Sequence, residues 1–448
     1  MKRRDFITRT AIAGGALTLG LSCNRKIESP EPAGNNVSTA VPYSGGKTIT
    51  EPERKIPVFA ETDVLVIGGG PAGAAAAIAA SRAGAETYLV ERYNHLGGLW
   101  TGGLVLPLLS THAVDKNNRR KQVIFGIGGE MSDRLKKLGM SIFEINPVID
   151  PEAGKYVLDE MIMESGVKMI YHTWASNVIM DGNTIKGVIL ENKSGRMAIL
   201  AKVVIDCTGD GDIFNLAGEN FDMMNYHIGL VHRLGNIDHI KPGIITDPKP
   251  DLGGETPIRG VNWVNMHGDN DQNGTDIITL SNLQMKYRKE IWESVQKIKS
   301  TPGYEDVFLL DTASQLGVRM SRILDGEYKL TLEDSMTYKS FKDVIGISGA
   351  WTTMLYKGKA VKAENRPLWQ IPYRSLLPKK TENLLTAGRC FCFEKELVED
   401  TRIIGTCLVT GHGAGAAAAL AVKNNERVRD IDTGRLKDLL VSQGAWLG

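Results

Sequence analysis

The chain has 448 residues, enough for two or three domains, and it is almost electrically neutral. Its 53 Lys and Arg nearly balance its 52 Asp and Glu, so no global field attracts an anionic polymer, and we expect no nucleic-acid partner. Five cysteines are too few for a disulfide scaffold, and a buried core must therefore stabilise the fold.

The first 23 residues are typical of an export signal. Lys2, Arg3 and Arg4 precede Asp5-Phe6-Ile7, and an apolar run follows from residue 11 to residue 21. This run is too short to span a bilayer, as expected of a signal peptide. The adjacent arginines resemble a twin-arginine signal, with an ordinary secretory signal as the alternative. We therefore expect export by the twin-arginine machinery to the periplasm or cell envelope.

Cys23 ends the apolar run and is a candidate lipid-bearing cysteine, which would anchor the protein to a membrane. The preceding Gly20-Leu21-Ser22 departs from the usual lipoprotein pattern, so simple cleavage and an unprocessed anchor are the alternatives. Residues 24–57 are rich in Pro, Gly, Ser, Asn and Thr and lack apolar periodicity. They predict a flexible linker outside the fold.

Residues 63–91 have the pattern of a complete dinucleotide-binding β-α-β unit. The aliphatic run 63–67 predicts a strand buried on both faces of a parallel sheet. It is followed at once by Gly68-Gly69-Gly70-Pro71-Ala72-Gly73, then by an Ala-rich helix to about Arg82 and a second strand that ends in Glu91. A merely Gly-rich loop would not have strand, helix and acid in register around it.

Each of these residues has a mechanical role. Gly68 permits the tight turn, Gly70 lets the backbone approach a pyrophosphate, and Gly73 lets helix and strand pack closely. The helix N-terminus offers free N–H groups and a positive dipole end to the phosphates. Glu91 can accept hydrogen bonds from the adenosine ribose hydroxyls.

A second glycine loop indicates which dinucleotide is bound. Gly97-Gly98 and Gly102-Gly103 follow Glu91 and Arg92 closely. A nicotinamide domain needs no such loop, whereas an FAD domain does, because the flavin end of the extended cofactor must meet backbone at close range. We therefore expect FAD. His95, Trp100 and His112 are candidates for the flavin environment, with packing or surface positions as the alternative.

Three further segments carry a family resemblance. The strand 202–207 ends in Thr208-Gly209-Asp210, the motif Gly317-Val318-Arg319-Met320-Ser321-Arg322 follows later, and residues 371–376, 383–390, 401–407 and 411–415 form a C-terminal set. Over about residues 61–422, this chain is similar to the FAD-dependent oxidoreductase family built on the glutathione-reductase-like FAD domain, a group that includes the flavin module of heterodisulfide reductase.

The resemblance implies an α/β fold. Its Rossmann-type FAD-binding domain comprises residues 58–213 and 375–448, and residues 214–374 form an inserted α+β substrate or cap domain. A strand at 383–386 would return to the FAD sheet, and a last helix opening at 411–415 would direct its positive dipole end at the flavin. The residues that we expect to hold FAD are Gly68, Gly70, Pro71, Ala72, Gly73, Glu91, Arg92, Gly97, Gly98, Thr208, Gly209, Asp210, Gly388, Arg389, Gly411, Gly413, Ala414 and Gly415.

The chain departs from the family pattern near the expected flavin. Gly405 and His412 stand where the family tends to have Pro and Gln, and residues 391–400 contain Cys392 and a cluster of four acids. Related FAD folds often have Gly-Asp in place of Gly388-Arg389, although the family that this chain resembles carries Arg there. These departures leave the substrate less defined than the cofactor.

Residues 214–374 differ in character from the segments around them. Residues 225–237 alternate like a strand, 258–272 are loop-rich, and 283–299 have helical periodicity. Arginines near a flavin commonly orient a carboxylate or stabilise negative charge, with a buried ion pair as the alternative. The candidate catalytic residues are His232, Arg319, Arg322, Arg374, Arg402 and His412, joined by His227 and Tyr373 as further active-site candidates.

A dehydrogenase also needs a base near the flavin. His232 or His412 would suit by intrinsic pKa, with a packed position as the alternative for either. Cys390 and Cys392 are spaced poorly for a disulfide, and no C-x-x-C lies near the first glycine loop. No haem, iron–sulfur or metal-site pattern is found in the sequence, so we expect FAD to be the sole redox cofactor.

These patterns predict an FAD-dependent dehydrogenase, oxidase or reductase that acts on a small organic substrate with an unidentified electron donor or acceptor. One alternative is a pyridine-nucleotide disulfide reductase, which would require a second GxGxxG unit; residues 251–260 are glycine-rich but follow no buried strand. The other is a non-catalytic electron-relay subunit of a complex.

Overall fold

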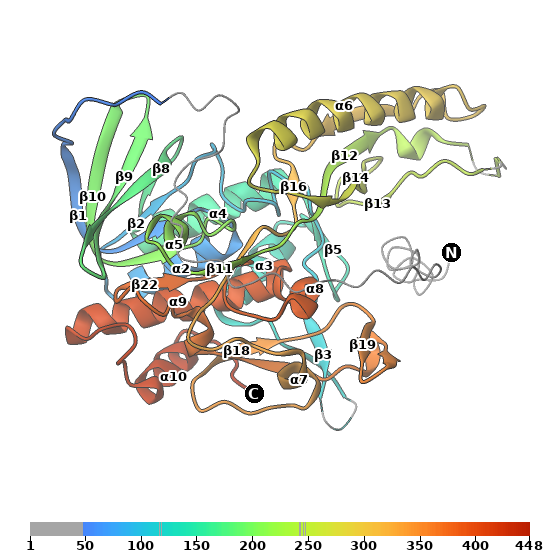
Figure 1. Cartoon of the computed structure of the whole chain (residues 1–448). Helices are drawn as coiled ribbons and strands as arrows, with labels where there is room; N and C mark the ends of the chain where they lie inside the picture. Colours follow the sequence, from blue (N-terminus) through green and yellow to red (C-terminus); the bar gives the residue numbers. More distant parts are fainter. Residues whose placement is uncertain (1–47, 116, 118, 242, 245, 247) are drawn as a thin grey trace, which may run out of the picture. The chain divides into compact units, whose positions relative to one another are not determined.

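The structure is a computed structural model that describes residues 48–448 except 116, 118, 242, 245 and 247 (Figure 1). The chain divides into two units, Met1–Glu53 and Arg54–Gly448. The predicted export signal, Cys23 and residues 24–47 of the predicted linker lie outside the described residues. Residues 48–57 form no helix or strand. All helices and strands named below belong to the second unit.

A seven-stranded sheet joins the first and last parts of this unit. Its strands are β1 (Val58–Ile67), β2 (Thr87–Val90), β7 (Lys168–Ile170), β8 (Trp174–Asp181), β9 (Thr184–Asn192), β10 (Gly195–Asp206) and β22 (Leu384–Thr386). β7, β2, β1 and β10 are adjacent and parallel, and β22 pairs in parallel with the end of β10. β9 and β8 form an antiparallel meander beside the start of β10. The predicted α/β fold with a Rossmann-type parallel sheet is confirmed.

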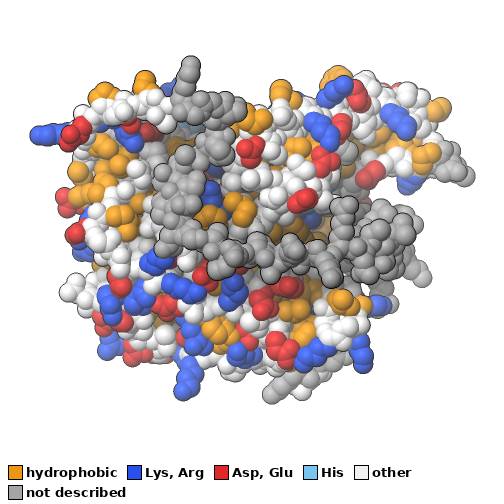
Figure 2. All heavy atoms as spheres, viewed as in Figure 1, with side chains coloured by type: hydrophobic (Ala, Val, Ile, Leu, Met, Phe, Trp, Pro, Cys, Tyr) orange, Lys and Arg blue, Asp and Glu red, His pale blue; other side chains and the backbone are white. Residues whose placement is uncertain are grey.

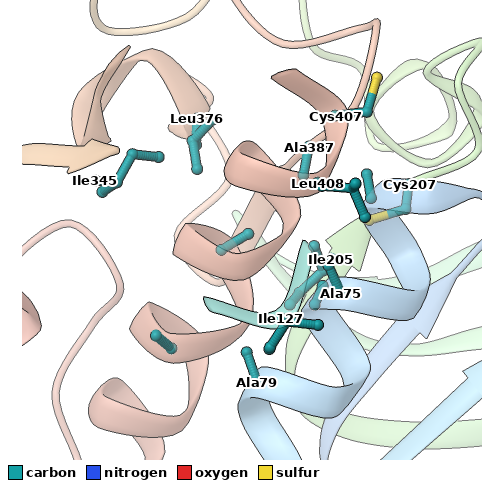
Figure 3. Close-up of a cluster of buried hydrophobic side chains, with 14 of the residues drawn as sticks. Ala75, Ala79, Ile127, Ile205, Cys207, Ile345, Leu376, Ala387, Cys407 and Leu408 are labelled. Carbon is teal, nitrogen blue, oxygen red and sulfur yellow. The ribbon is translucent and has the colours of Figure 1, made fainter. Parts of the chain in front are cut away.

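The central strand β1 is buried on both faces because it is aliphatic on both. Val64 and Val66 belong to a core cluster that includes α2 (Pro71–Arg82) and α9 (Ile404–Asn424), whereas Leu65 and Ile67 pack in a second cluster with β8 and β9. Figure 3 shows Ala75, Ala79, Ile205 and Leu408 gathered in the first cluster. Three further helices complete this layer: α3 (Gly126–Lys137), α4 (Pro151–Ser165) and α10 (Thr433–Ser442).

Helices α2 and α9 touch backbone to backbone. A Cβ added at Gly411 would lie 2.1 Å from the carbonyl oxygen of Ala72, and one added at Gly415 would lie 2.0 Å from that of Ala76. Because both contacts advance by four residues, the two helices run in parallel. Side chains larger than hydrogen would force them apart.

The predicted start of the last helix at residues 411–415 is wrong. α9 begins at Ile404, and Gly411, Gly413, Ala414 and Gly415 lie in its interior. The glycine run reflects close packing on α2, and for Gly413 on Ile345, rather than a helix terminus. Since Ile404 precedes Gly411 by seven residues and α2 begins one residue before Ala72, the N-terminus of α9 extends beyond that of α2 by about 9 Å.

α9 is long and apolar enough to cross a membrane, with a mean hydropathy of 1.3. However, 94% of its most apolar window is buried inside the protein, as in the core helix of a globular fold. His412, in the interior of α9, is 4% exposed, and its Nε2 lies 2.8 Å from Oε1 of Gln443 on the segment after α10. Burial lowers the pKa of His412 to about 4.

A separate five-stranded sheet lies within the segment that was predicted to be the cap. It consists of β12 (Tyr226–Gly235), β13 (Gly254–Glu255), β14 (Asn262–Gln272), β15 (Phe308–Thr312) and β16 (Gly317–Val318). One helix, α6 (Ile277–Lys299), packs on the sheet through side chains spaced like one helical face: Leu283, Tyr287, Ile291, Val295 and Ile298. Figure 1 shows this helix alongside β12 and β14.

The interpretation of residues 258–272 as loop-rich is wrong, because 262–272 form β14. The stretch is rich in Asn, Asp and Gly, which are uncommon in strands, but antiparallel pairing with β12 along its length holds it extended. Gly268 permits this pairing, since a Cβ there would lie 2.2 Å from the carbonyl oxygen of Ile228.

The remaining elements are short. The strands are β3 (His112–Val114), β4 (Arg120–Gln122), β5 (Ser141–Ile142), β6 (Val148–Ile149), β11 (Phe221–Met223), β17 (Arg322–Leu324), β18 (Val344–Ser348), β19 (Met354–Tyr356), β20 (Lys359–Val361) and β21 (Trp369–Pro372). The helical segments are α5 (Asp212–Leu216), α7 (Leu332–Met336), α8 (Val398–Thr401), η1 (Ile237–His239), η2 (Ala363–Asn365), η3 (Tyr373–Leu376) and η4 (Lys395–Leu397). On the face shown in Figure 2, acidic and basic side chains are interspersed.

The α2–α9 contact predicts a specific sensitivity to a single methyl group. Gly415→Ala should lower the free energy of unfolding by about 1–3 kcal/mol, because the helices must separate. Gly129→Ala is the matched control, since Gly129 is also helical but its Cβ would meet only the Ile124 carbonyl oxygen at 3.5 Å. That control should be neutral or gain up to about 1 kcal/mol from helix propensity. Urea unfolding measures both, and equal effects would contradict the close packing.

Burial of His412 predicts a pH dependence of stability. Its folded pKa of about 4 lies below the value of 6.5 for a free His, so the unfolded chain binds more protons between these pH values. Stability should therefore fall as the pH drops from 6.5 toward 4. Between pH 7 and pH 4.5 the wild type should lose about 2–3 kcal/mol more than His412→Gln, which cannot titrate. Identical losses in urea unfolding at the two pH values would show that His412 is not buried as a neutral ring.

Candidate cofactor and active site

The first glycine loop combines glycines that the fold requires with one that faces open space. Gly68 has φ of +97°, and a Cβ there would lie 2.4 Å from the carbonyl oxygen of Cys207. A Cβ at Gly73 would lie 1.7 Å from the carbonyl oxygen of Gly68. A Cβ at Gly70, in contrast, would meet nothing within 4 Å. Gly70 therefore leaves room for a ligand at the start of α2, where Pro71 is the first residue and no side chain caps the helix.

The second glycine loop lies directly on the first. The Gly97 N–H donates to the carbonyl oxygen of Gly69 over 2.8 Å, and a Cβ at Gly98 would lie 3.1 Å from the Cα of Gly70. Both residues have positive φ, +93° and +48°. The two loops predicted separately from the sequence thus form one backbone-lined surface.

Glu91 and Arg92 are held rigidly beside these loops. Glu91 is 6% exposed, and its carboxylate accepts hydrogen bonds from the Gly69 N–H at 2.6 Å and the Tyr93 N–H at 2.8 Å. The guanidinium of Arg92 lies 4.9 Å from the Tyr93 ring centre and 5.0 Å from that of Trp174. These contacts place an acceptor and a cation at the end of β2.

Asp206 fixes the turn at the end of β10. It is fully buried and accepts hydrogen bonds from the Thr208 N–H and hydroxyl, at 3.0 and 2.7 Å, and from the N–H groups of Ile213 and Phe214. Four donors on one carboxylate clamp the backbone between them. The turn that carries Thr208, Gly209 and Asp210 is therefore preformed.

Arg389 and Asp210 link this turn to the C-terminal part of the chain. Arg389 Nη2 donates to Asp210 over 2.7 Å, and Nη1 is buried without a hydrogen-bond partner among the described residues. Burial would raise the pKa of Asp210, but the charges of Arg389 and Arg92 outweigh it and the pKa lies below its ordinary value. An ionised Asp210 thus holds Arg389 with one N–H group left for an anionic ligand. The adjacent Gly388 has φ of +85°.

Arg322, a predicted catalytic residue, begins β17 and contacts the same turn. Its Nη1 donates to the Asp210 carbonyl oxygen at 2.9 Å and to Asp212 at 3.1 Å. Burial, followed by the nearby charges of Asp210 and Asp206, raises the pKa of Asp212 to about 6. Arg322 therefore compensates acidic charge within the protein.

A second polar cluster contains Arg319 and Arg402, which the sequence also singled out. Arg402 forms an ion pair with Glu399, and the Tyr226 hydroxyl donates to the other Glu399 oxygen at 2.6 Å. Arg319 follows β16, and burial together with the charge of Arg402 lowers its pKa to about 10. His227 lies near enough to both arginines to feel their charges. Burial, followed by the charge of Arg319, lowers the pKa of His227. Its Nδ1 contacts Asn270 Oδ1 at 3.1 Å.

The two clusters are neighbours. Arg389 and Arg402 both exert their charge on the thiol of Cys407, in the first turn of α9, whose pKa burial raises to about 12. Figure 3 shows Cys407 and Cys207, at the end of β10, at the same end of the buried cluster. This is the carboxyl end of the parallel strands, where open α/β sheets bind their ligands.

Other predicted residues are not part of either cluster. Arg374 is exposed and pairs with Asp343, and Tyr373 is buried with its hydroxyl on the Val428 carbonyl oxygen. His232 lies five residues, about 17 Å, along β12 from His227 and is paired with Val264 and Thr312.

The three candidates for the flavin environment also have distinct positions. His95 is buried beside Thr101 and Gln315. Trp100 is a core residue, and His112 begins β3.

Several residues at this edge were not predicted. Tyr226 and Trp351 contact Glu399, the latter through a hydrogen bond from its indole N–H to the Glu399 carbonyl oxygen at 2.5 Å. The N-terminus of α9 at Ile404 was missed because Ile403, its N-cap residue, makes no side-chain cap hydrogen bond and carries no start signal. The acidic cluster of residues 394–400 was the sole sequence signal for Glu399.

Comparisons with known proteins find both sequence relatives and solved structures. The thiamine thiazole synthase of Saccharolobus islandicus is 29% identical over 172 residues, covering 36% of this chain and 59% of that protein. That of Metallosphaera sedula is 28% identical over 170 residues, covering 36% and 58%. The chain therefore spans less than two thirds of the length of these relatives.

Solved structures are more distant. A geranylgeranyl bacteriochlorophyll reductase-like protein from Thermoplasma acidophilum is 13% identical with a TM-score of 0.42, covering 86% of this chain and 84% of that one. The p-nitrophenol 4-monooxygenase of Pseudomonas putida is 11% identical with a TM-score of 0.41, covering 86% and 85%. Similarity at this level carries no argument about activity.

The family model described as FAD dependent oxidoreductase matches residues 63–440. This range includes both glycine loops, the Asp206 turn and the Arg319–Arg402 cluster. The open space at Gly70 and the unpaired Arg389 N–H fit FAD as the cofactor. The chain is therefore an enzyme that belongs to the FAD-dependent oxidoreductase family.

Proposed function

We propose that the protein is an exported FAD-dependent dehydrogenase or reductase that acts on a small organic substrate in the cell envelope. The observation that carries this proposal is the polar cluster at the carboxyl edge of the parallel sheet, in which the Arg319 N–H donates to the His227 carbonyl oxygen and Arg402 pairs with Glu399. The resemblance of the first 23 residues to a twin-arginine signal supports export of the folded, cofactor-loaded chain.

The chain offers a complete set of groups for the ADP half of FAD. The Gly68–Gly73 loop and the start of α2 would hold the pyrophosphate, and Glu91 the ribose hydroxyls. Arg389 would donate its unpaired N–H to the cofactor. When bound, FAD supplies an acceptor or donor of hydride at its N5 atom.

His227 is the residue best suited to move a proton. Its lowered pKa keeps the ring neutral at pH 7, and Nε2 is buried with no hydrogen-bond partner within the described part of the chain. Tyr226 is less suited, because burial and Glu399 raise its pKa to about 12. We infer that His227, rather than His232 or His412, accepts or donates the substrate proton.

The disulfide-reductase alternative is not favoured. Cys207, Cys390, Cys392 and Cys407 are free and buried. Burial raises the pKa of Cys392 to about 11 and that of Cys407 to about 12, so neither is a reactive thiolate at neutral pH.

Substitution of Arg389 tests its assignment to FAD. Arg389→Gln should weaken FAD binding about 10- to 100-fold, because a charge-assisted hydrogen bond is lost. Arg427→Gln is the control, since Arg427 is an exposed arginine paired with Asp430. The dissociation constant is measured by flavin fluorescence with the apoprotein. Unchanged affinity in a folded Arg389→Gln variant would remove Arg389 from the cofactor site.

The proposed function is tested on the full chain produced in a bacterium with twin-arginine export. The periplasmic fraction should contain yellow protein. One member of a panel of small acids, alcohols and amines should either reduce the flavin, seen as loss of its oxidised absorbance, or reoxidise the reduced flavin. His227→Gln should slow this step about 100-fold or more without loss of FAD. The variant with Arg3→Lys and Arg4→Lys should stay in the cytoplasm. Yellow protein that no compound reduces or reoxidises would contradict the proposal.

A further inference from the structure

Arg319 differs from nearly every other arginine that the fold shields from water. Among the described arginines that are not exposed, only Arg92 and Arg319 lack a carboxylate within ion-pair distance. Arg92 is compensated by two aromatic rings beside the cofactor loops. Arg319 has no side-chain hydrogen bond within the described residues, and its Nε is buried.

The neighbouring acid cannot neutralise Arg319. Glu399 already forms an ion pair with Arg402 through one oxygen and accepts the Tyr226 hydroxyl with the other. The cluster therefore contains two guanidinium groups and one carboxylate, leaving one positive charge without a partner. Shielding an unpaired charge from water is costly, and an anionic ligand that pairs with Arg319 would offset this cost.

The backbone that carries Arg402 is held in place by hydrogen bonds, so the position of the Arg402 guanidinium is fixed. Asp400 and Arg366 form an ion pair with side-chain exposures of 0% and 1%. Arg366 also donates to the Thr352 carbonyl oxygen at 3.1 Å, and Asp400 accepts from the Trp351 N–H at 3.3 Å. These bonds fix α8 and residues 351–352 together, so the cluster is organised before any ligand binds.

We propose that Arg319 and Arg402 bind a carboxylate group of the substrate, and that the substrate is therefore a small organic acid. The inference rests on the proposed function, because it names the substrate class of the same site. A planar guanidinium matches the two oxygens of a carboxylate, and the incoming charge restores neutrality to the cluster. The Arg319 N–H donates to the His227 carbonyl oxygen over 3.4 Å, so His227 would lie beside the bound acid and could exchange a proton with it.

Direct binding of acids and their neutral isosteres tests this assignment on the FAD-loaded protein. Acetate and benzoate are titrated in chloride-free buffer, with acetamide and benzamide as matched controls and inorganic phosphate as a second anion. Binding is measured from the perturbation of the flavin absorbance and from the thermal shift. We expect at least one carboxylate to bind more than tenfold tighter than its amide and tighter than phosphate.

Variants assign the binding to the two arginines. Arg319→Gln and Arg402→Gln should each weaken carboxylate binding about 10- to 100-fold. Arg319→Lys keeps the positive charge but loses the planar pair of N–H donors. Its carboxylate affinity should therefore fall between those of Arg319→Gln and the wild type. Arg259→Gln is the control, because Arg259 is exposed and paired with Asp238. FAD content and unfolding temperature show which variants are folded. If Arg319→Gln does not fold, Arg319→Lys tests the role of Arg319 in its place.

The outcomes separate the two proposals. Equal binding of acids and amides, tighter binding of phosphate, or full carboxylate affinity in a folded Arg319→Gln variant would overturn the carboxylate site. Turnover of neutral alcohols or amines, with no effect of carboxylates, would also overturn it while the oxidoreductase proposal stands. Carboxylate binding lost in Arg319→Gln, without redox turnover of any acid, would support the site and contradict the proposed function.

Discussion

The contact of α9 with α2 is the constraint on which the rest of the site depends. It brings a helix from residues 404–424 against a helix from residues 71–82 with no side chain between them at Gly411 and Gly415. Because the helices are parallel, the start of α9 lies at the same edge of the sheet as the start of α2, where the glycine loop lies. Arg402, one residue before the N-cap of α9, is thereby brought to the carboxyl edge of the sheet. The glycine contact between the two helices thus determines where the Arg402 guanidinium lies, the group that we propose binds the substrate.

The acidic side chains of the site are each paired with donors or cations. One short turn carries three of them, Asp206, Asp210 and Asp212, and each has different partners. Asp206 is satisfied by four hydrogen-bond donors, Asp210 by Arg389 and Ser321, and Asp212 by Arg322. After these pairings, Arg92 and Arg319 have no carboxylate within ion-pair distance, and Arg389 keeps one buried nitrogen, Nη1, without a partner among the described residues. Those are the positions where an anionic cofactor and an anionic substrate would be expected.

The cofactor half of the site could be predicted from the sequence because its signals are local. Strand, glycine loop, helix and Glu91 fall within 29 consecutive residues (63–91), and the family match to residues 63–440 agrees with the FAD assignment. The start of α9 could not be predicted from the sequence. Its glycines lie where the helix packs closely on α2, not at its N-terminus, and its N-cap residue, Ile403, is apolar. β14 was missed for a related reason, because strand pairing overrides an Asn- and Asp-rich sequence. Tyr226, Arg319 and Glu399 come from three distant segments, and topology alone brings them together.

The free cysteines bear on how the protein would survive in its proposed compartment. All four described thiols are buried, and the pKa of each is raised. A folded chain of this kind presents no thiolate to oxidants or to disulfide-exchange enzymes. An unfolded chain would expose all four to an oxidising environment and risk mispaired bridges. Folding before translocation would therefore protect the redox state of the core as well as the retention of the cofactor.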